Sequence, residues 1–117
     1  MKIKKIGDKI IVTKTGNNII DDFADLLEFL KIKLYDNSPF YVAQIWEKNT
    51  DPSKHKPLPS TIEFCANLDP NGAEQVIFAV YTREAEMIEI DLKVINNMPE
   101  IYQLKLRKIF SEKKIKI

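Results

Sequence analysis

The residues that could carry out enzyme chemistry are few and stand apart. Cys65 is the only cysteine of the chain and His55 the only histidine. A nucleophilic mechanism needs a thiol or hydroxyl next to a base, and a structural zinc site needs four Cys or His ligands. His55 stands between two lysines, and no histidine pattern surrounds Cys65. The sequence therefore predicts no catalytic residue, no metal and no cofactor, with His55 a solvated surface residue and Cys65 a bystander thiol.

Carboxylates gather in one short stretch, which holds Glu84, Glu86, Glu89 and Asp91. Clustered carboxylates can bind the metal ion of a small hydrolase or nuclease. Spaced acidic residues more often form a solvated surface, so a hydrolase or nuclease is less favoured than either of the two binding functions described below. The expectation is that the protein is not an enzyme.

The basic residues are concentrated at the two ends of the chain. Residues 1–9 hold four lysines against one aspartate, and residues 103–117 hold six basic residues against one glutamate, although the whole chain carries only +1. The middle is therefore acidic. Such ends are either solvated tails or surfaces for an anionic partner such as DNA phosphates. The candidate phosphate contacts are Lys2, Lys4, Lys5, Lys105, Arg107, Lys108, Lys113, Lys114 and Lys116.

Length and composition predict one domain over residues 1–117. The chain is 44% hydrophobic and 30% charged, which is ordinary for a soluble globular protein. No apolar run is long enough to span a membrane, and no signal peptide follows Met1. We expect a protein that stays inside the cell and has no membrane partner.

The stretch 38–47 is rich in aromatic and β-branched residues and begins with a Ser-Pro pair, which predicts an extended strand. Apolar residues stand on both faces of this strand, with Phe40, Val42 and Trp46 on one and Tyr41, Ala43 and Ile45 on the other. Burial of both faces requires cover on both sides. We therefore expect this to be the central strand of a sheet or small barrel.

Local patterns place the other elements on either side of it. For residues 22–34 we favour a helix from Asp22 to about Leu30 and then a strand to Leu34, because the apolar positions change from a helical to an alternating spacing. The remaining expectations, in chain order, are a strand at 9–14 with a turn at 15–18, an exposed loop at 48–60, strands at 61–68 and 75–81 joined by a turn at 69–72, and a strand or helical turn at 87–95. The predicted fold class is all-β, barrel-like, with short helices.

Four sequence motifs, taken in chain order, resemble the bromo-adjacent homology (BAH) domain of chromatin proteins. Residues 8–22 are similar to the strand and D-x-x-G-x-x-I-D turn that open the domain in the largest subunit of the fungal origin recognition complex and in related silencing factors. Residues 39–45 resemble the family's Pro-Tyr-Val-Ala-x-Ile strand, residues 74–78 its glutamate-led strand, and residues 87–95 the segment that closes its barrel. The resemblance covers residues 6–104. Two features differ from the family. Fungal members carry a longer, basic insert where this chain has the short, acidic segment 23–28. The ATPase domain that follows in the origin subunit is absent from this sequence.

The resemblance implies a non-catalytic nuclear module that binds nucleosomes, through histones and DNA phosphates, in replication-origin licensing or gene silencing. Other subunits of the origin recognition complex or silencing assembly would be further partners. The alternative is an interaction domain that recruits a protein through a sheet edge or the proline-rich loop and never contacts nucleosomes.

Animal relatives bind methylated lysine in an aromatic cage, and matching by motif places Tyr41, Phe64 and Phe78 at or next to the cage positions, as candidate histone contacts. Ala79 stands where another ring is expected. A methylammonium ion needs several ring faces, because each contributes only about 0.5–2 kcal/mol. We therefore predict that the chain does not distinguish methylated from unmethylated lysine.

Overall fold

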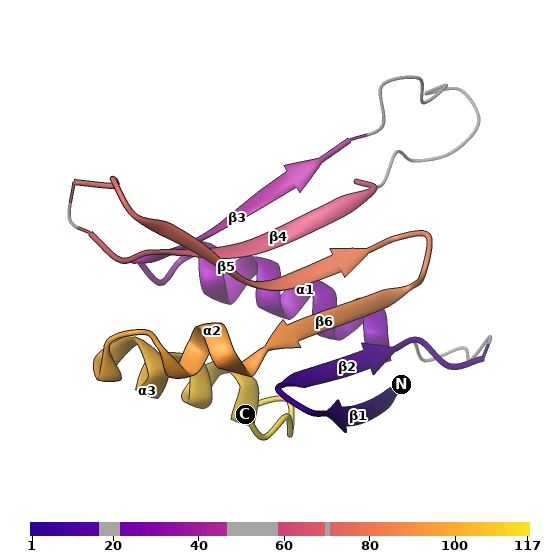
Figure 1. The fold of residues 1–117 in the computed structure, drawn as a ribbon. Helices are drawn as coiled ribbons and strands as arrows, with labels where there is room; N and C mark the ends of the chain where they lie inside the picture. The colour runs from indigo at the N-terminus through magenta and orange to yellow at the C-terminus, as the bar shows by residue number, and fades with distance from the viewer. Residues whose placement is uncertain (17–21, 47–58, 70) are drawn as a thin grey trace.

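A computed structural model describes residues 1–16, 22–46, 59–69 and 71–117. Its main feature is a six-stranded sheet in the order β1-β2-β6-β5-β4-β3, with every neighbouring pair antiparallel (Figure 1). The strands are β1 (Lys2–Ile6), β2 (Lys9–Thr13), β3 (Phe40–Ile45), β4 (Thr61–Asn67), β5 (Gln75–Thr82) and β6 (Met87–Asp91), and the helices are α1 (Asp22–Tyr35), α2 (Leu92–Asn96) and α3 (Glu100–Ser111). The predicted all-β, barrel-like class is confirmed only in its coarser part: the structure is mostly sheet, with three helices among the described residues.

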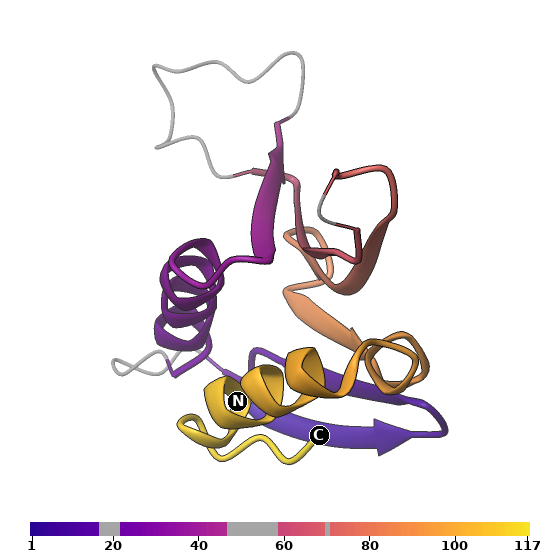
Figure 2. The ribbon, with the colours of Figure 1, turned by 90° about the vertical axis from the view of Figure 1, so that its left-hand side faces the viewer.

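The chain path explains the strand order. β1 and β2 form a hairpin, after which α1 lies between β2 and β3, the strand at the far end of the sheet; β3 to β6 then return strand by strand until β6 pairs with β2. The sheet is curved, and α1 and α3 both lie on its concave side (Figure 2). β1 and β3 end the strand order, and the described residues show no pairing that would close the sheet into a barrel.

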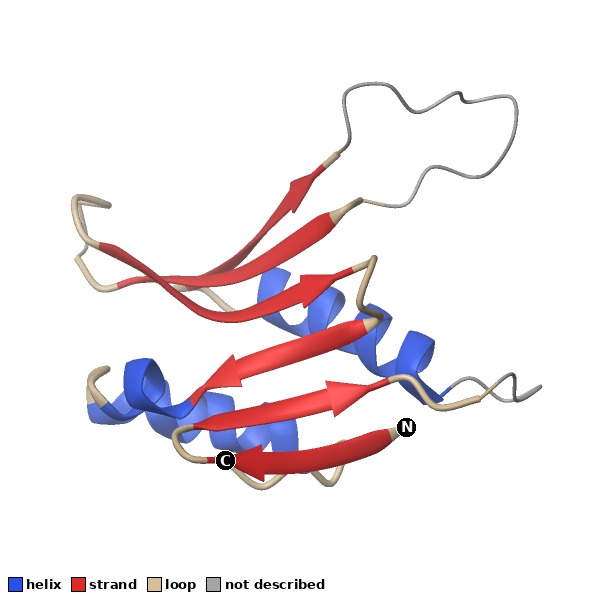
Figure 3. Cartoon of the chain, turned by 45° about the vertical axis from the view of Figure 1, so that its right-hand side comes forward, coloured by secondary structure: helices blue, strands red, loops and turns tan. Residues whose placement is uncertain are grey.

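The hydrophobic core lies between this concave side and the helices. Strand residues that alternate along the sheet, such as Ile10, Val12 and Phe64, are buried in one cluster with residues of α1 and α3. We call this side the inner face. The outer face carries no described helix (Figure 3).

The prediction of a central strand at 38–47 is wrong, because β3 is an edge strand. Phe40 is buried against Phe78 and Tyr102, but Ile45 and Trp46 at the other end of the stretch are each about half exposed. Aromatic and β-branched content indicates a strand without fixing its place in the sheet, since an edge strand still covers the core with one face.

The predicted strand at 30–34 is also wrong, because α1 continues to Tyr35. The buried residues Phe23, Leu26, Leu30 and Leu34 repeat at spacings of three and four, which places them on one side of a helix. Ile32 shared the alternating pattern with Leu30 and Leu34 but is 56% exposed. The helical spacing thus determines which residues face the core.

The predicted hairpin at 61–81 is confirmed. Asp69 Oδ1 accepts a hydrogen bond from Asn71 N (2.9 Å), Gly72 N donates to Asp69 O (2.9 Å), and Gly72 has the positive φ (+69°) that glycine tolerates. A register shift opposite Phe64 makes a bulge in β5, and Phe78 and Ala79 are consecutive buried residues there.

Both expected structures occur within residues 87–95. β6 ends at Asp91, whose Oδ1 accepts from Val94 N (3.2 Å) and caps α2. α3 then buries Leu106, Ile109 and Phe110. The predicted turn at 15–18 and the loop at 48–60 lie partly outside the described residues, and His55 lies outside them.

Candidate anion-binding site

The C-terminal segment turns back onto the core at the end of α3. Lys114 N donates to Ser111 O (3.0 Å) and Ile115 N donates to Phe110 O (3.0 Å). These two bonds form a Schellman motif, in which the residue between the bonded turns adopts a left-handed conformation; Lys114 has that conformation, with φ +60°. The motif delivers Ile115, which is only 1% exposed, into the core beside the helix end.

A second contact holds this segment against α1. The Lys113 ammonium lies 4.9 Å from the centre of the Phe29 ring, within the range of a cation–π interaction, and Lys33 lies 5.8 Å from the same ring. Residues 112–117 are therefore fixed by backbone hydrogen bonds, a buried isoleucine and an aromatic contact.

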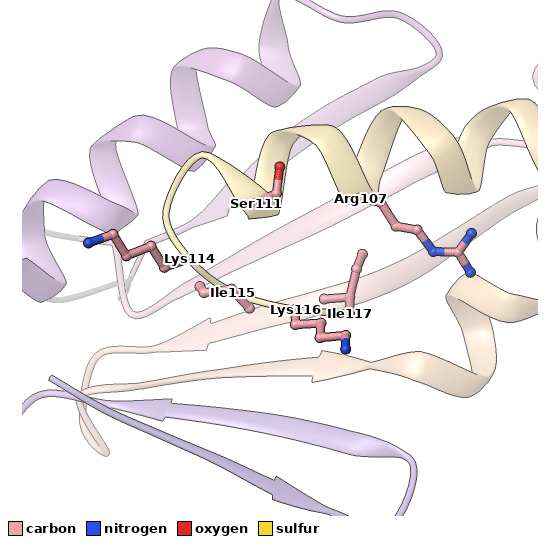
Figure 4. Close-up of a pocket in the computed structure, with 6 residues that line it drawn as sticks. All are labelled: Arg107, Ser111, Lys114, Ile115, Lys116 and Ile117. Atoms are coloured by element: carbon pink, nitrogen blue, oxygen red, sulfur yellow. The ribbon is translucent and has the colours of Figure 1, made fainter.

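The fold of this segment forms a pocket of about 490 Å³. Figure 4 shows its six lining residues, which are Arg107, Ser111, Lys114, Ile115, Lys116 and Ile117. The two isoleucines supply apolar surface and three side chains are cationic, while none of the six has a carboxylate side chain. We call these residues the C-terminal pocket.

The cations differ in orientation. In Figure 4 the head groups of Arg107 and Lys116 lie toward the same end of the pocket, whereas the Lys114 ammonium points away from them, toward α1. Arg107 Nη2 donates to Gln103 Oε1 (3.3 Å), a long hydrogen bond that leaves other guanidinium donors for an oxyanion. This arrangement fits an anion bound by Arg107 and Lys116, with an apolar part over the isoleucines.

The basic residues predicted from sequence do not form one surface. Lys105, Arg107 and Lys108 are exposed on α3, but Lys105 Nζ reaches Ser38 O (3.4 Å) and only Arg107 lines the pocket. On β1, Lys2 lies opposite Thr13 of β2, and Lys4 lies opposite Ile11. The β2 residues that alternate with these two, Ile10 and Val12, face the core. Lys2 and Lys4 therefore point to the outer face, and Lys5, opposite Ile10, to the helix side.

The aromatic residues proposed as histone contacts are not assembled into a cage. Phe64 and Phe78 are fully buried, and Phe78 packs edge-on against Phe40 with ring centres 5.8 Å apart. Tyr41 is half-buried on the outer face, and its hydroxyl donates to Gln75 Oε1 (2.6 Å). Rings on opposite faces of a sheet cannot surround one ammonium ion, and Ala79, also buried, supplies no ring.

Sequence reasoning missed the three uncharged residues of the site. Ser111, Ile115 and Ile117 were not singled out, because the usual sign of this helix ending is a glycine and the chain has Lys114 there instead. The one available signal was the spacing of Phe110 and Ile115, which matches the hydrophobic contact that accompanies a Schellman motif.

The candidate metal ligands have other partners or lie at the surface. Glu89 forms an ion pair with Lys9, Asp91 caps α2, and Glu84 and Glu86 are exposed in the turn between β5 and β6. The described part of the chain contains no group of three or more His, Cys, Asp or Glu side chains placed to hold a metal ion.

The single thiol is inaccessible. Cys65 is 3% exposed, and burial raises the pKa of its thiol, an effect that the hydrogen bond with Tyr41 only partly offsets. A buried, protonated thiol is a poor nucleophile.

No protein-family model matches the chain, and comparison with curated proteins and with solved structures finds no match. None of the helices in the described ranges is long and apolar enough to cross a membrane.

Proposed function

We propose that the chain is a non-catalytic binding module whose C-terminal pocket and α3 contact the phosphate groups of a nucleic acid. The observation that carries this proposal is the lining of the C-terminal pocket, where the cationic side chains of Arg107 and Lys116 both border a hollow that also has apolar walls. From Ile101 to Ser111 the helix carries three basic residues and no acidic one, and one of them, Arg107, lines the pocket.

A purely structural role accounts for part of this charge. Cations near the end of a helix interact favourably with its unpaired carbonyl groups, and Lys108 lies in the last turn of α3. That effect does not explain Lys116, which lies beyond the helix and borders the pocket.

Nucleosomal DNA is the nucleic acid implied by the resemblance to BAH domains. The proposal extends to a nuclear location, to a role in replication origins or silencing, and to contacts with other subunits of those assemblies. These parts, and the barrel of the BAH fold, depend on the four sequence motifs alone. An open curved sheet is sufficient for the phosphate contacts, since they come from α3 and residues 112–117.

Binding to reconstituted nucleosomes, free DNA and free histones across a salt series tests this proposal. The Arg107→Gln/Lys116→Gln variant is expected to bind nucleosomes and DNA more weakly. The slope of log affinity against log salt should become shallower by about 0.9 for each phosphate that the variant no longer neutralises. Lys93→Gln removes one charge from the exposed side of α2 and is the control for the loss of a single surface charge.

The same salt series tests the lysines of β1 and sets out what would contradict the proposal. If Lys2→Gln/Lys4→Gln also flattens the salt slope, the outer side of β1 takes part in binding. An unchanged slope in the Arg107→Gln/Lys116→Gln variant, or no binding to any of the three ligands, would contradict the proposal.

The alternative function, recruitment of a protein without nucleosome contact, is favoured by a different observation. β3 is an exposed sheet edge without a charged side chain, and such edges bind strands of other chains. Retained binding to histones or other proteins with no affinity for DNA would support this alternative.

A further inference from the structure

The two edges of the sheet differ in how they are protected. β1 carries Lys2, Lys4 and Lys5. Lysines on an edge strand oppose pairing with another strand, because pairing would crowd their charged side chains. β3, at the other edge, reads Phe-Tyr-Val-Ala-Gln-Ile and has no charge, and the described residues contain no strand that pairs with its free side.

The register shows which backbone groups of β3 point to the free side. Asn67 N donates to Pro39 O (3.1 Å), so residues 39, 41, 43 and 45 direct their backbone groups toward β4. Because this direction alternates along an antiparallel strand, Val42 and Gln44 direct their N–H and C=O groups outward. Phe40 N, which also points away from β4, is already bonded to Asn37 O (2.9 Å).

We propose that β3 pairs antiparallel with β3 of a second copy of this chain, around a twofold axis that passes through Ala43. Val42 of each copy then lies opposite Gln44 of the other, and both residues of each pair exchange N–H···O bonds, so all the outward groups of Val42 and Gln44 are satisfied. The two sheets join into one, with both inner faces on the same side.

The side chains favour a second copy as the occupant. Residues that meet at a pair without hydrogen bonds stand closest together, and the residue at the axis is an alanine, which avoids a clash with its own image. On the same face Tyr41 lies opposite Ile45 of the other copy, an aromatic and β-branched pair that stabilises antiparallel strands. This contact covers Ile45, which is 46% exposed in the single chain.

Analytical ultracentrifugation over a dilution series tests the pairing. We expect the unmodified chain to shift from the mass of one chain to that of two as concentration rises. Ala43→Lys and Ala43→Glu each place like charges across the axis, so each variant alone should lose the dimer. An equimolar mixture of the two variants should regain it, because opposite charges then face each other.

Val80→Lys is the matched control. It adds the same charge to the outer face in the interior of the sheet, between Glu63 and Glu89, and should leave the dimer intact. Gln44→Pro removes an N–H that points outward and makes no bond to β4, so the monomer keeps its sheet while the dimer is lost.

A monomer at every concentration would overturn the inference. So would a dimer that both Ala43 variants retain, or a mixture of them that stays monomeric. None of these results depends on nucleic-acid binding, because β3 contributes no residue to the C-terminal pocket.

Discussion

Lys114 shows how a single backbone conformation shapes the candidate site. Its φ of +60° lies in the left-handed region, which is unfavourable for a residue with a Cβ atom. The conformation is retained because it completes the Schellman motif and places Ile115 in the core. Formation of the pocket is therefore coupled to local backbone strain.

Replacing Lys114 by glycine should relieve that strain. We expect Lys114→Gly to stabilise the protein by about 1 kcal/mol, the approximate cost of a left-handed residue that is not glycine. The measurement is the free energy of unfolding from urea denaturation. Lys114→Ala is the control, since it removes the same charge but keeps the Cβ atom; a glycine variant no more stable than the alanine variant would contradict this account.

The sequence pointed to residues of the candidate site by their charge but not by their position. Arg107, Lys114 and Lys116 were expected to meet phosphates, and the structure places all three around one pocket. Lys2, Lys4 and Lys105 carry the same charge, yet they project elsewhere, because strand alternation and helix phase decide where a side chain points. Charge is visible in a sequence, whereas its direction depends on the packing of the element that carries it.

At the scale of elements, α1 shows why local patterns mislead. Leu30, Ile32 and Leu34 alternate as in a strand, but the preceding Phe23 and Leu26 fit a helix as well. The choice is made by tertiary packing, since the helix buries four residues against the inner face of the sheet. Residues 87–95 were left open between a strand and a helical turn, and the local cap at Asp91 marks where one gives way to the other.

Paired alanine variants distinguish the two patterns. Leu30→Ala is expected to lower the free energy of unfolding by about 2–5 kcal/mol, because it leaves a cavity in the core. Ile32→Ala should change it by about 0.5 kcal/mol or less, since Ile32 faces solvent on the helix. Comparable losses at both positions would mean that the two side chains share a buried face, as in a strand.

At the scale of the molecule, the sheet content and the β4–β5 hairpin followed from alternation and turn chemistry, both of which are local. The order of the strands did not, because the pairing of β2 with β6 joins segments that are distant in sequence. The edge position of β3 also could not be read from composition. That position leaves one side of an uncharged strand open.

Alkaline pH should destabilise the protein, because several groups hold their protons more tightly in the folded chain. Burial raises the pKa of Cys65 above its ordinary 9.0 and the pKa values of Tyr41 and Tyr81 above 10.0, and the hydrogen bond and charge of Glu89 raise that of Lys9 above 10.5. The unfolded chain therefore loses these protons first. Stability that is fully present below pH 9.0 is lost as the pH rises through the raised values.

Urea denaturation at a series of pH values from neutral to above 10.5 measures this effect. We expect the free energy of unfolding to be constant below about 9 and to fall beyond it. Cys65→Ala removes the group with the lowest ordinary pKa, so the fall should begin closer to pH 10.0, where the tyrosines start to ionise in the unfolded chain. A free energy that rises across this range would contradict the prediction, and an onset that Cys65→Ala leaves unmoved would show that the thiol does not contribute.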